Sequence, residues 1–97
     1  MNYITIAGAS YYMGIEAFHV GQILTIEKEP RNSFDDEAIR VVSDNGATYG
    51  YVANSTDSVA RGTHSAGYIY RDFESTARIR ICFILCGKAI AEILSAD

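Results

Sequence analysis

The chain has 97 residues, of which 48% are hydrophobic and 21% are charged, and this composition excludes a disordered protein. A chain of this length buries about two-thirds of the surface that its unfolded form exposes, so we expect one folded domain over residues 1–97. Eight basic and twelve acidic side chains give a net charge of −4. This balance argues against a protein that coats duplex DNA, but not against a small pocket for one or two nucleotides.

Four strands are predicted in the first half of the chain, where β-branched and aromatic residues alternate with other residues. They cover residues 3–8, 22–29, 38–43 and 47–53. Asn45 and Gly46 predict a hairpin with a type I′ turn between the last two, because both residue types tolerate positive φ. Gly50 predicts a β-bulge or a close approach of another backbone within the last of these strands.

The second half of the chain is predicted to begin with a short helix over residues 54–61. Two strands follow, over residues 67–73 and 77–85. In the second of them, strict alternation puts the odd-numbered positions from Ile79 to Leu85 on one face. Residues 88–95 fit a strand and a helix nearly equally well, since a short apolar run does not distinguish the two.

These elements indicate a mainly β fold with one or two short helices, either a small antiparallel barrel or a sandwich. No apolar run approaches the roughly 20 residues that span a bilayer, and residues 1–12 lack the basic start and apolar centre of a signal peptide. A cytoplasmic protein without a membrane partner is the default expectation.

The two cysteines do not predict a disulfide or a metal site. Cys82 and Cys86 lie four residues apart in a predicted strand, hence about 13 Å apart, which is too far to bridge. Together with His19 and His64 they are numerous enough for zinc, but no pair has the C-x-x-C or H-x-x-x-H spacing of zinc ligands. We expect reduced thiols, no metal and no cofactor.

The loop over residues 30–37 has an unusual composition for a connection. Pro30, the only proline, stops the preceding strand because it lacks an N–H group. Asn32 and Asp35 are suited to turns in which a side-chain oxygen accepts a hydrogen bond from an N–H group two residues on. Acids occupy positions 35–37, but neither a nucleophile nor a Walker motif accompanies them, so an enzyme is not predicted. An ordered binding loop is expected.

Three motifs along the chain match one known pattern. The first is an aromatic pair, Tyr11 and Tyr12, shortly after Gly8. The second is the segment 29–41, of the form acid-Pro-x-Asn-x-aromatic-Asp-x-x-Ala-Ile-x-Val, and the third is Gly-Tyr-Val at 50–52. On these motifs the chain resembles the HIRAN domain family and, in particular, its small free-standing bacterial members, and the resemblance covers nearly the whole chain.

The resemblance implies a six-stranded, OB-like antiparallel β-barrel with two small helices. It also implies a nucleic-acid-binding module, because the characterised helicase member of the family captures the 3′-hydroxyl end of single-stranded DNA at stalled replication forks. The implied partners are single-stranded DNA or its 3′ ends, and a helicase or another DNA-repair protein.

The resemblance further implies roles for individual residues. Tyr11 and Phe34 would sandwich the terminal base, and Asp35 would accept a hydrogen bond from the 3′-hydroxyl. Asn32 would bond the base or backbone nearby, and Tyr51 stands where the family often has a phosphate-contacting histidine. The full set of candidate nucleic-acid-binding residues is Tyr11, Tyr12, Lys28, Arg31, Asn32, Phe34, Asp35, Tyr51 and Asn54.

The chain departs from the DNA-binding member at several of these positions. Ser10, Tyr51 and Asn54 stand in place of an arginine, a histidine and a lysine, and Phe34 lacks a tyrosine hydroxyl. Each lost cation removes a phosphate contact, so end binding is expected to be weaker or directed to another ligand. The cations left for phosphate contact are Lys28, Arg31 and Arg61.

A second interpretation is a protein-interaction or assembly domain that keeps the barrel but not DNA-end binding. The acidic balance and the seven tyrosines favour it, because tyrosine is enriched at protein interfaces. The two interpretations differ in whether Tyr11, Phe34 and Asp35 converge on one open cleft.

Overall fold

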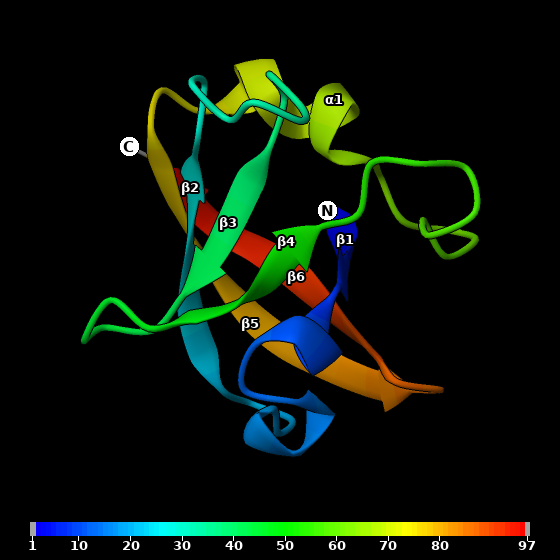
Figure 1. Ribbon diagram of the computed structural model, residues 1–97. Helices are drawn as coiled ribbons and strands as arrows, with labels where there is room; N and C mark the ends of the chain where they lie inside the picture. Colours follow the sequence, from blue (N-terminus) through cyan, green and yellow to red (C-terminus); the bar gives the residue numbers. More distant parts are fainter. Residues whose placement is uncertain (1, 97) are drawn as a thin grey trace.

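The computed structural model describes residues 2–96, which form a closed barrel of six antiparallel strands (Figure 1). The strands are β1 (Tyr3–Ala7), β2 (Ile23–Lys28), β3 (Ile39–Val42), β4 (Thr48–Val52), β5 (Thr76–Leu85) and β6 (Lys88–Ala96). Their order around the barrel is β1-β4-β3-β2-β5-β6, so β1 closes the barrel by pairing with both β4 and β6. The predicted class, a mainly β six-stranded antiparallel barrel, is confirmed.

Branched aliphatic side chains fill the barrel because alternate positions of each strand point inward. Among the fully buried side chains are Ile4, Ile6, Ile26, Ile39, Val41, Ile79 and Ile81. Each such side chain stabilises the fold by about 1.5–3 kcal/mol relative to an exposed position. Thr5 points outward from β1 but is also buried, because the segment that contains Thr63 packs over it. The hydroxyl groups of Thr5 and Thr63 form a hydrogen bond at 2.7 Å.

The elements predicted over residues 54–73 are wrong. Residues 54–61 form turns, and the helix α1 (Ala66–Ile69) with a 3-10 turn, η3 (Tyr70–Asp72), occupies the predicted strand. The Ser65 side chain caps α1 by accepting a hydrogen bond from the Tyr68 N–H group, and the two ends of the helix, Ala66 and Ile69, are buried. Two further 3-10 turns are η1 (Ala9–Tyr11) and η2 (Ile15–Ala17). No helix within residues 2–96 is long and apolar enough to cross a membrane.

The strand over residues 77–85 is confirmed, but its predicted facing is only half right. The register of β5 against β6 shifts between Ile81 and Phe83, which breaks the alternation. Phe83 and Leu85 are therefore exposed, at 56% and 60%, while Ile84 packs against the core. The strand alternative for residues 88–95 is confirmed by β6, and the helix alternative is wrong.

The hairpin between β3 and β4 is confirmed, whereas its predicted type I′ turn is wrong. The Gly46 N–H group donates to the Ser43 carbonyl at 2.9 Å, and only Gly46 among the loop residues has positive φ, at 87°. This is a three-residue loop with a glycine bulge. Positive φ at two successive loop residues occurs instead at Cys86 and Gly87, which join β5 to β6. Both cysteines are free thiols.

Gly50 meets both predictions made for it. Two residues of β4, Thr48 and Gly50, pair with the successive β3 residues Val42 and Val41, so the ladder has a bulge between them. A Cβ atom at Gly50 would lie 2.7 Å from the Ala7 carbonyl oxygen of β1. The missing side chain therefore permits the closure of the barrel between β1 and β4.

We predict that Gly50→Ala lowers the free energy of unfolding by about 1–3 kcal/mol, because the added methyl group pushes β4 away from β1. Urea denaturation followed by circular dichroism measures this change. Ser10→Ala, at an exposed position, should stay within about 0.5 kcal/mol of the wild type. Equal stability of Gly50→Ala and wild type would contradict the tight β1–β4 contact.

Candidate functional site

Side-chain hydrogen bonds order the loop between β2 and β3. The Asn32 Oδ1 atom accepts hydrogen bonds from the N–H groups of Phe34, at 2.9 Å, and Asp35, at 3.1 Å. Asp35 Oδ1 accepts from the N–H group of Glu37 at 2.9 Å. The predicted turn-closing roles of Asn32 and Asp35 are confirmed. The loop holds the Phe34 ring almost entirely in solvent, with 97% of the residue exposed.

The carboxamide of Asn54 ties this loop to the rest of the protein. Its Nδ2 atom donates to Asp35 Oδ2 at 3.0 Å and to Glu37 Oε1 at 3.3 Å, and its Oδ1 atom accepts from the Gly67 N–H group at 2.8 Å. The β2–β3 loop therefore lies beside α1 at one end of the barrel (Figure 1). A Cβ atom at Gly67 would lie 2.6 Å from Glu37 Oε1, so a larger residue at this position would displace the Glu37 carboxylate.

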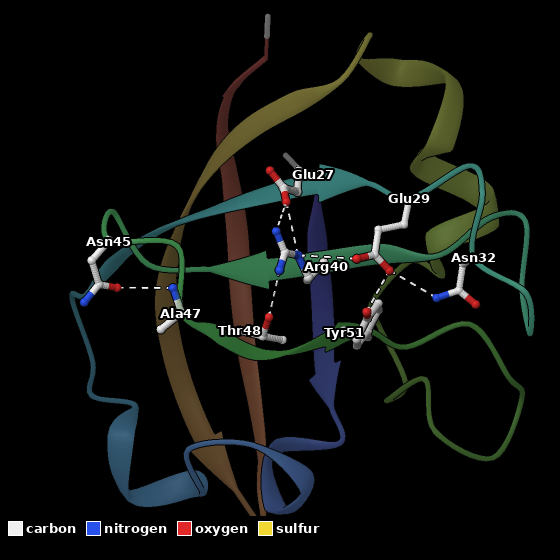
Figure 2. A network of polar contacts seen from close by, with 8 residues as sticks. All are labelled: Glu27, Glu29, Asn32, Arg40, Asn45, Ala47, Thr48 and Tyr51. Atoms are coloured by element: carbon white, nitrogen blue, oxygen red, sulfur yellow. Dashed lines mark hydrogen bonds and ion pairs between the residues drawn. The ribbon is translucent and has the colours of Figure 1, made fainter.

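A second polar network holds the barrel wall beside the loop (Figure 2). Glu29 Oε1 accepts hydrogen bonds from the Tyr51 hydroxyl, at 2.7 Å, and from Asn32 Nδ2, at 3.1 Å. Glu29 Oε2 lies 3.4 Å from Arg40 Nε, and Arg40 also pairs with Glu27. Glu29 thus fixes two of the candidate residues. It belongs to the loop motif, but the sequence alone gave it no such role.

Seven candidate residues meet at one open cleft of about 550 Å³. They are Tyr11, Tyr12, Asn32, Phe34, Asp35, Tyr51 and Asn54. Tyr11 ends η1 and Phe34 lies in the β2–β3 loop. The two residues are 85% and 97% exposed, so their ring faces are free for a ligand. Tyr12 packs against Tyr51, with ring centroids 6.0 Å apart. The first cleft, as we call it, is thus an aromatic site with a carboxylate in its wall.

The other two candidate residues lie outside the first cleft. The Lys28 ammonium sits over the rings of Tyr70 and Phe73, 4.3 and 5.0 Å from their centroids, which are cation–π distances. Arg31 lines a separate hollow with Glu29 and neighbouring loop residues. The structure therefore brings neither Lys28 nor Arg31 to the aromatic rings of the first cleft.

The first cleft carries one charged side chain among its lining residues, the carboxylate of Asp35, and neither lysine nor arginine. An ionised carboxylate has about four acceptor positions. Contacts with Glu37 and Asn54 occupy two of them, one on each oxygen. The remaining positions on Asp35 suit a hydroxyl donor, and the negative charge disfavours a phosphate at the same place.

Burial raises the pKa of Tyr51 well above the usual value for tyrosine, and the hydrogen bond to Glu29 and the charge of its carboxylate raise it further. The neighbouring Tyr12 adds a smaller effect in the same direction. Tyr51 is therefore a neutral hydrogen-bond donor and not a phenolate. The hydrogen bond with Glu27 is the largest factor that raises the pKa of Arg40, which stays cationic.

We predict that Tyr51 remains protonated at pH values near 10, where an ordinary tyrosine ionises. The folded state therefore binds this proton more tightly, and the stabilisation, complete below about pH 10, declines as the pH rises further. Glu29→Gln should lower the pKa of Tyr51, whereas Glu27→Gln, which affects Arg40 but does not contact Tyr51, should change it little. A ¹³Cζ-tyrosine NMR titration, assigned with Tyr51→Phe, measures both. A wild-type midpoint near 10 would contradict the network.

Comparison with known proteins agrees with this architecture. A family model described as the HIRAN domain matches residues 1–80. The crystal structure of a protein from Lactobacillus plantarum is 17% identical with a TM-score of 0.61, and the alignment covers 98% of this chain and 93% of that one. The HIRAN domain of human HLTF is 17% identical with a TM-score of 0.60, covering 98% of this chain and 75% of that one.

At this level of identity, the two structures show a shared fold and nothing finer. No curated protein matches the chain significantly. The family model, however, matches well over half of the chain, from β1 into β5. The chain therefore belongs to the HIRAN domain family.

Proposed function

We propose that the chain is a nucleic-acid-binding module whose first cleft takes the 3′-hydroxyl end of single-stranded DNA. The observation that carries this proposal is the meeting of Tyr11, Phe34 and Asp35, from two separate segments, at one open cleft. Both rings are almost fully exposed and line the same cleft, and contiguous exposed apolar surface of this kind marks ligand-binding grooves. Membership of the HIRAN family supports the same class of ligand.

In the proposed complex the terminal base stacks on Tyr11 and Phe34. Base–aromatic stacking contributes about 1–3 kcal/mol per base and is tolerant of sequence, because every base has a π-face. Asp35 accepts a hydrogen bond from the terminal 3′-hydroxyl through an acceptor position that Asn54 and Glu37 leave unused. In the middle of a strand a phosphate group would occupy that place, and the carboxylate charge would repel it. The site therefore selects an end over an interior position.

The other residues of the first cleft act mainly by positioning in this proposal. The Tyr51 hydroxyl donates a hydrogen bond to Glu29, which fixes the ring against which Tyr12 packs at the cleft wall. The side-chain oxygen of Asn32 accepts hydrogen bonds from two N–H groups of the loop backbone. Because no cation lines the first cleft, affinity for the end itself should depend weakly on salt. A role in DNA repair beside a helicase is the cellular setting that the family suggests.

We predict that the wild type binds a short single-stranded oligonucleotide with a 3′-hydroxyl more tightly than the same oligonucleotide with a 3′-phosphate. Asp35→Asn removes the charge that repels phosphate, together with one of the two hydrogen bonds that the carboxylate accepts, and should lose most of this preference. Tyr11→Ala should weaken both complexes about 5- to 100-fold, and Tyr11→Phe should not. Fluorescence anisotropy competition measures the binding of both oligonucleotides by the wild type and by the three variants. The proposal fails if the wild type binds neither oligonucleotide, or binds both equally.

A further inference from the structure

A second cleft, of about 490 Å³, adjoins the first, because Asn54 and Ser55 line both. It lies on the segment between β4 and α1, which projects beside the barrel in Figure 1. Its lining residues include Asn54, Ser55, Arg61, His64, Ser65 and Tyr68. A ligand that leaves the first cleft across Asn54 enters the second.

Tyr68 presents an aromatic platform in this second cleft. Its ring stacks on the His64 ring with centroids 4.1 Å apart and an angle of 7° between the planes. One face of the ring is therefore covered, yet the residue is 59% exposed. The Tyr68 N–H group donates to the cap residue Ser65, which fixes the backbone of the platform. The ring is placed to accept a base without further ordering of the side chain.

Arg61 makes the second cleft electrostatically different from the neighbouring hollows. Within residues 2–96, its guanidinium forms neither an ion pair nor a hydrogen bond, and no carboxylate lines the second cleft. The two other hollows that share residues with the first cleft each combine a cation with an acid, Arg31 with Glu29 and Lys88 with Glu16. A phosphate is therefore better accommodated beside Arg61 than at either alternative.

The segment that carries the second cleft is held firmly against β1. The Thr5 hydroxyl accepts a hydrogen bond from the Ala60 N–H group at 3.0 Å, and Thr63 Oγ1 donates to the Ala60 carbonyl at 2.7 Å. The His64 N–H group donates to the Tyr3 carbonyl at 2.8 Å. These contacts keep the segment in place before any ligand arrives, which lowers the ordering cost of binding.

We propose that the second cleft binds nucleotides upstream of the last two at the 3′ end of a single strand. A preceding base stacks on Tyr68, and the backbone phosphate beside it contacts Arg61. This inference rests on the proposed function, because it gives the path of the strand whose end lies in the first cleft. The first cleft, which has no cation, would then bind the end of the strand, and the second cleft, which has Arg61, would bind the preceding part of the strand.

The test compares unlabelled oligothymidylates of two and six nucleotides, each with a free 3′-hydroxyl, as competitors in fluorescence anisotropy. The wild type should bind the hexamer at least tenfold more tightly than the dimer. Tyr68→Ala should weaken hexamer binding about tenfold and leave dimer binding within about twofold, since the base contact is lost only for the longer strand. Arg61→Gln should lower the slope of log affinity against log salt by about 0.7 for the hexamer.

Matched controls keep the test specific. Arg71→Gln removes an exposed cation that lines neither cleft and should bind the hexamer like the wild type. Tyr68→Phe keeps the ring and should retain binding. In ¹H–¹⁵N spectra, the hexamer but not the dimer should shift the amide signals of residues 61–68.

Two failures are distinguishable. If the wild type binds both oligonucleotides with equal affinity, end capture stands and the second cleft is overturned as a binding site. The same conclusion follows if Tyr68→Ala leaves hexamer binding unchanged. If the wild type binds neither oligonucleotide and its amide signals do not shift, the proposed function fails, and this inference fails with it.

Discussion

The hydrogen bonds of the Asn54 carboxamide are the contacts on which the rest of the site depends. This side chain joins the end of β4 to Asp35 and Glu37 in the loop and to the start of α1. The side-chain oxygens of Asn32 and Asp35 hold the loop backbone, and the Asn54 carboxamide joins this loop to the barrel. With Asn54 in place, Asp35 faces the first cleft and Phe34 is held in solvent. The binding surface exists before the ligand, and little conformational entropy remains to be lost on binding.

The distribution of charge follows from the same arrangement. Glu29 has Arg40 and Tyr51 as partners, and Lys28 lies over two aromatic rings, so these charges are engaged within the protein. Asp35 is left as the charge of the first cleft, and Arg61 as the charge of the second. In the proposed complex an acidic protein can bind a polyanion, because the end would be recognised by stacking and a hydroxyl contact while a separate cation would receive the phosphate.

Much of the barrel is predictable from the sequence because a barrel wall has one buried face. Side chains that point inward and outward therefore alternate along β1 to β4, and this alternation is visible in the sequence. The turn-closing roles of Asn32 and Asp35 are also local, since each acceptor lies two or three residues from its donor. Prediction failed where the cause is tertiary. The register shift in β5 resets the alternation, and α1 is a single turn that depends on the burial of Ala66 and Ile69. The bond from Tyr51 to Glu29 spans 22 residues and has no local signal.

The most direct measurement is a crystal structure of the chain with a single-stranded thymidine trinucleotide that has a free 3′-hydroxyl. The account predicts the terminal base between the rings of Tyr11 and Phe34, with its 3′-oxygen at hydrogen-bonding distance, about 2.5–3.0 Å, from Asp35. A trinucleotide bound elsewhere on the barrel would contradict it. So would a terminal base in the first cleft whose 3′-hydroxyl points away from the carboxylate.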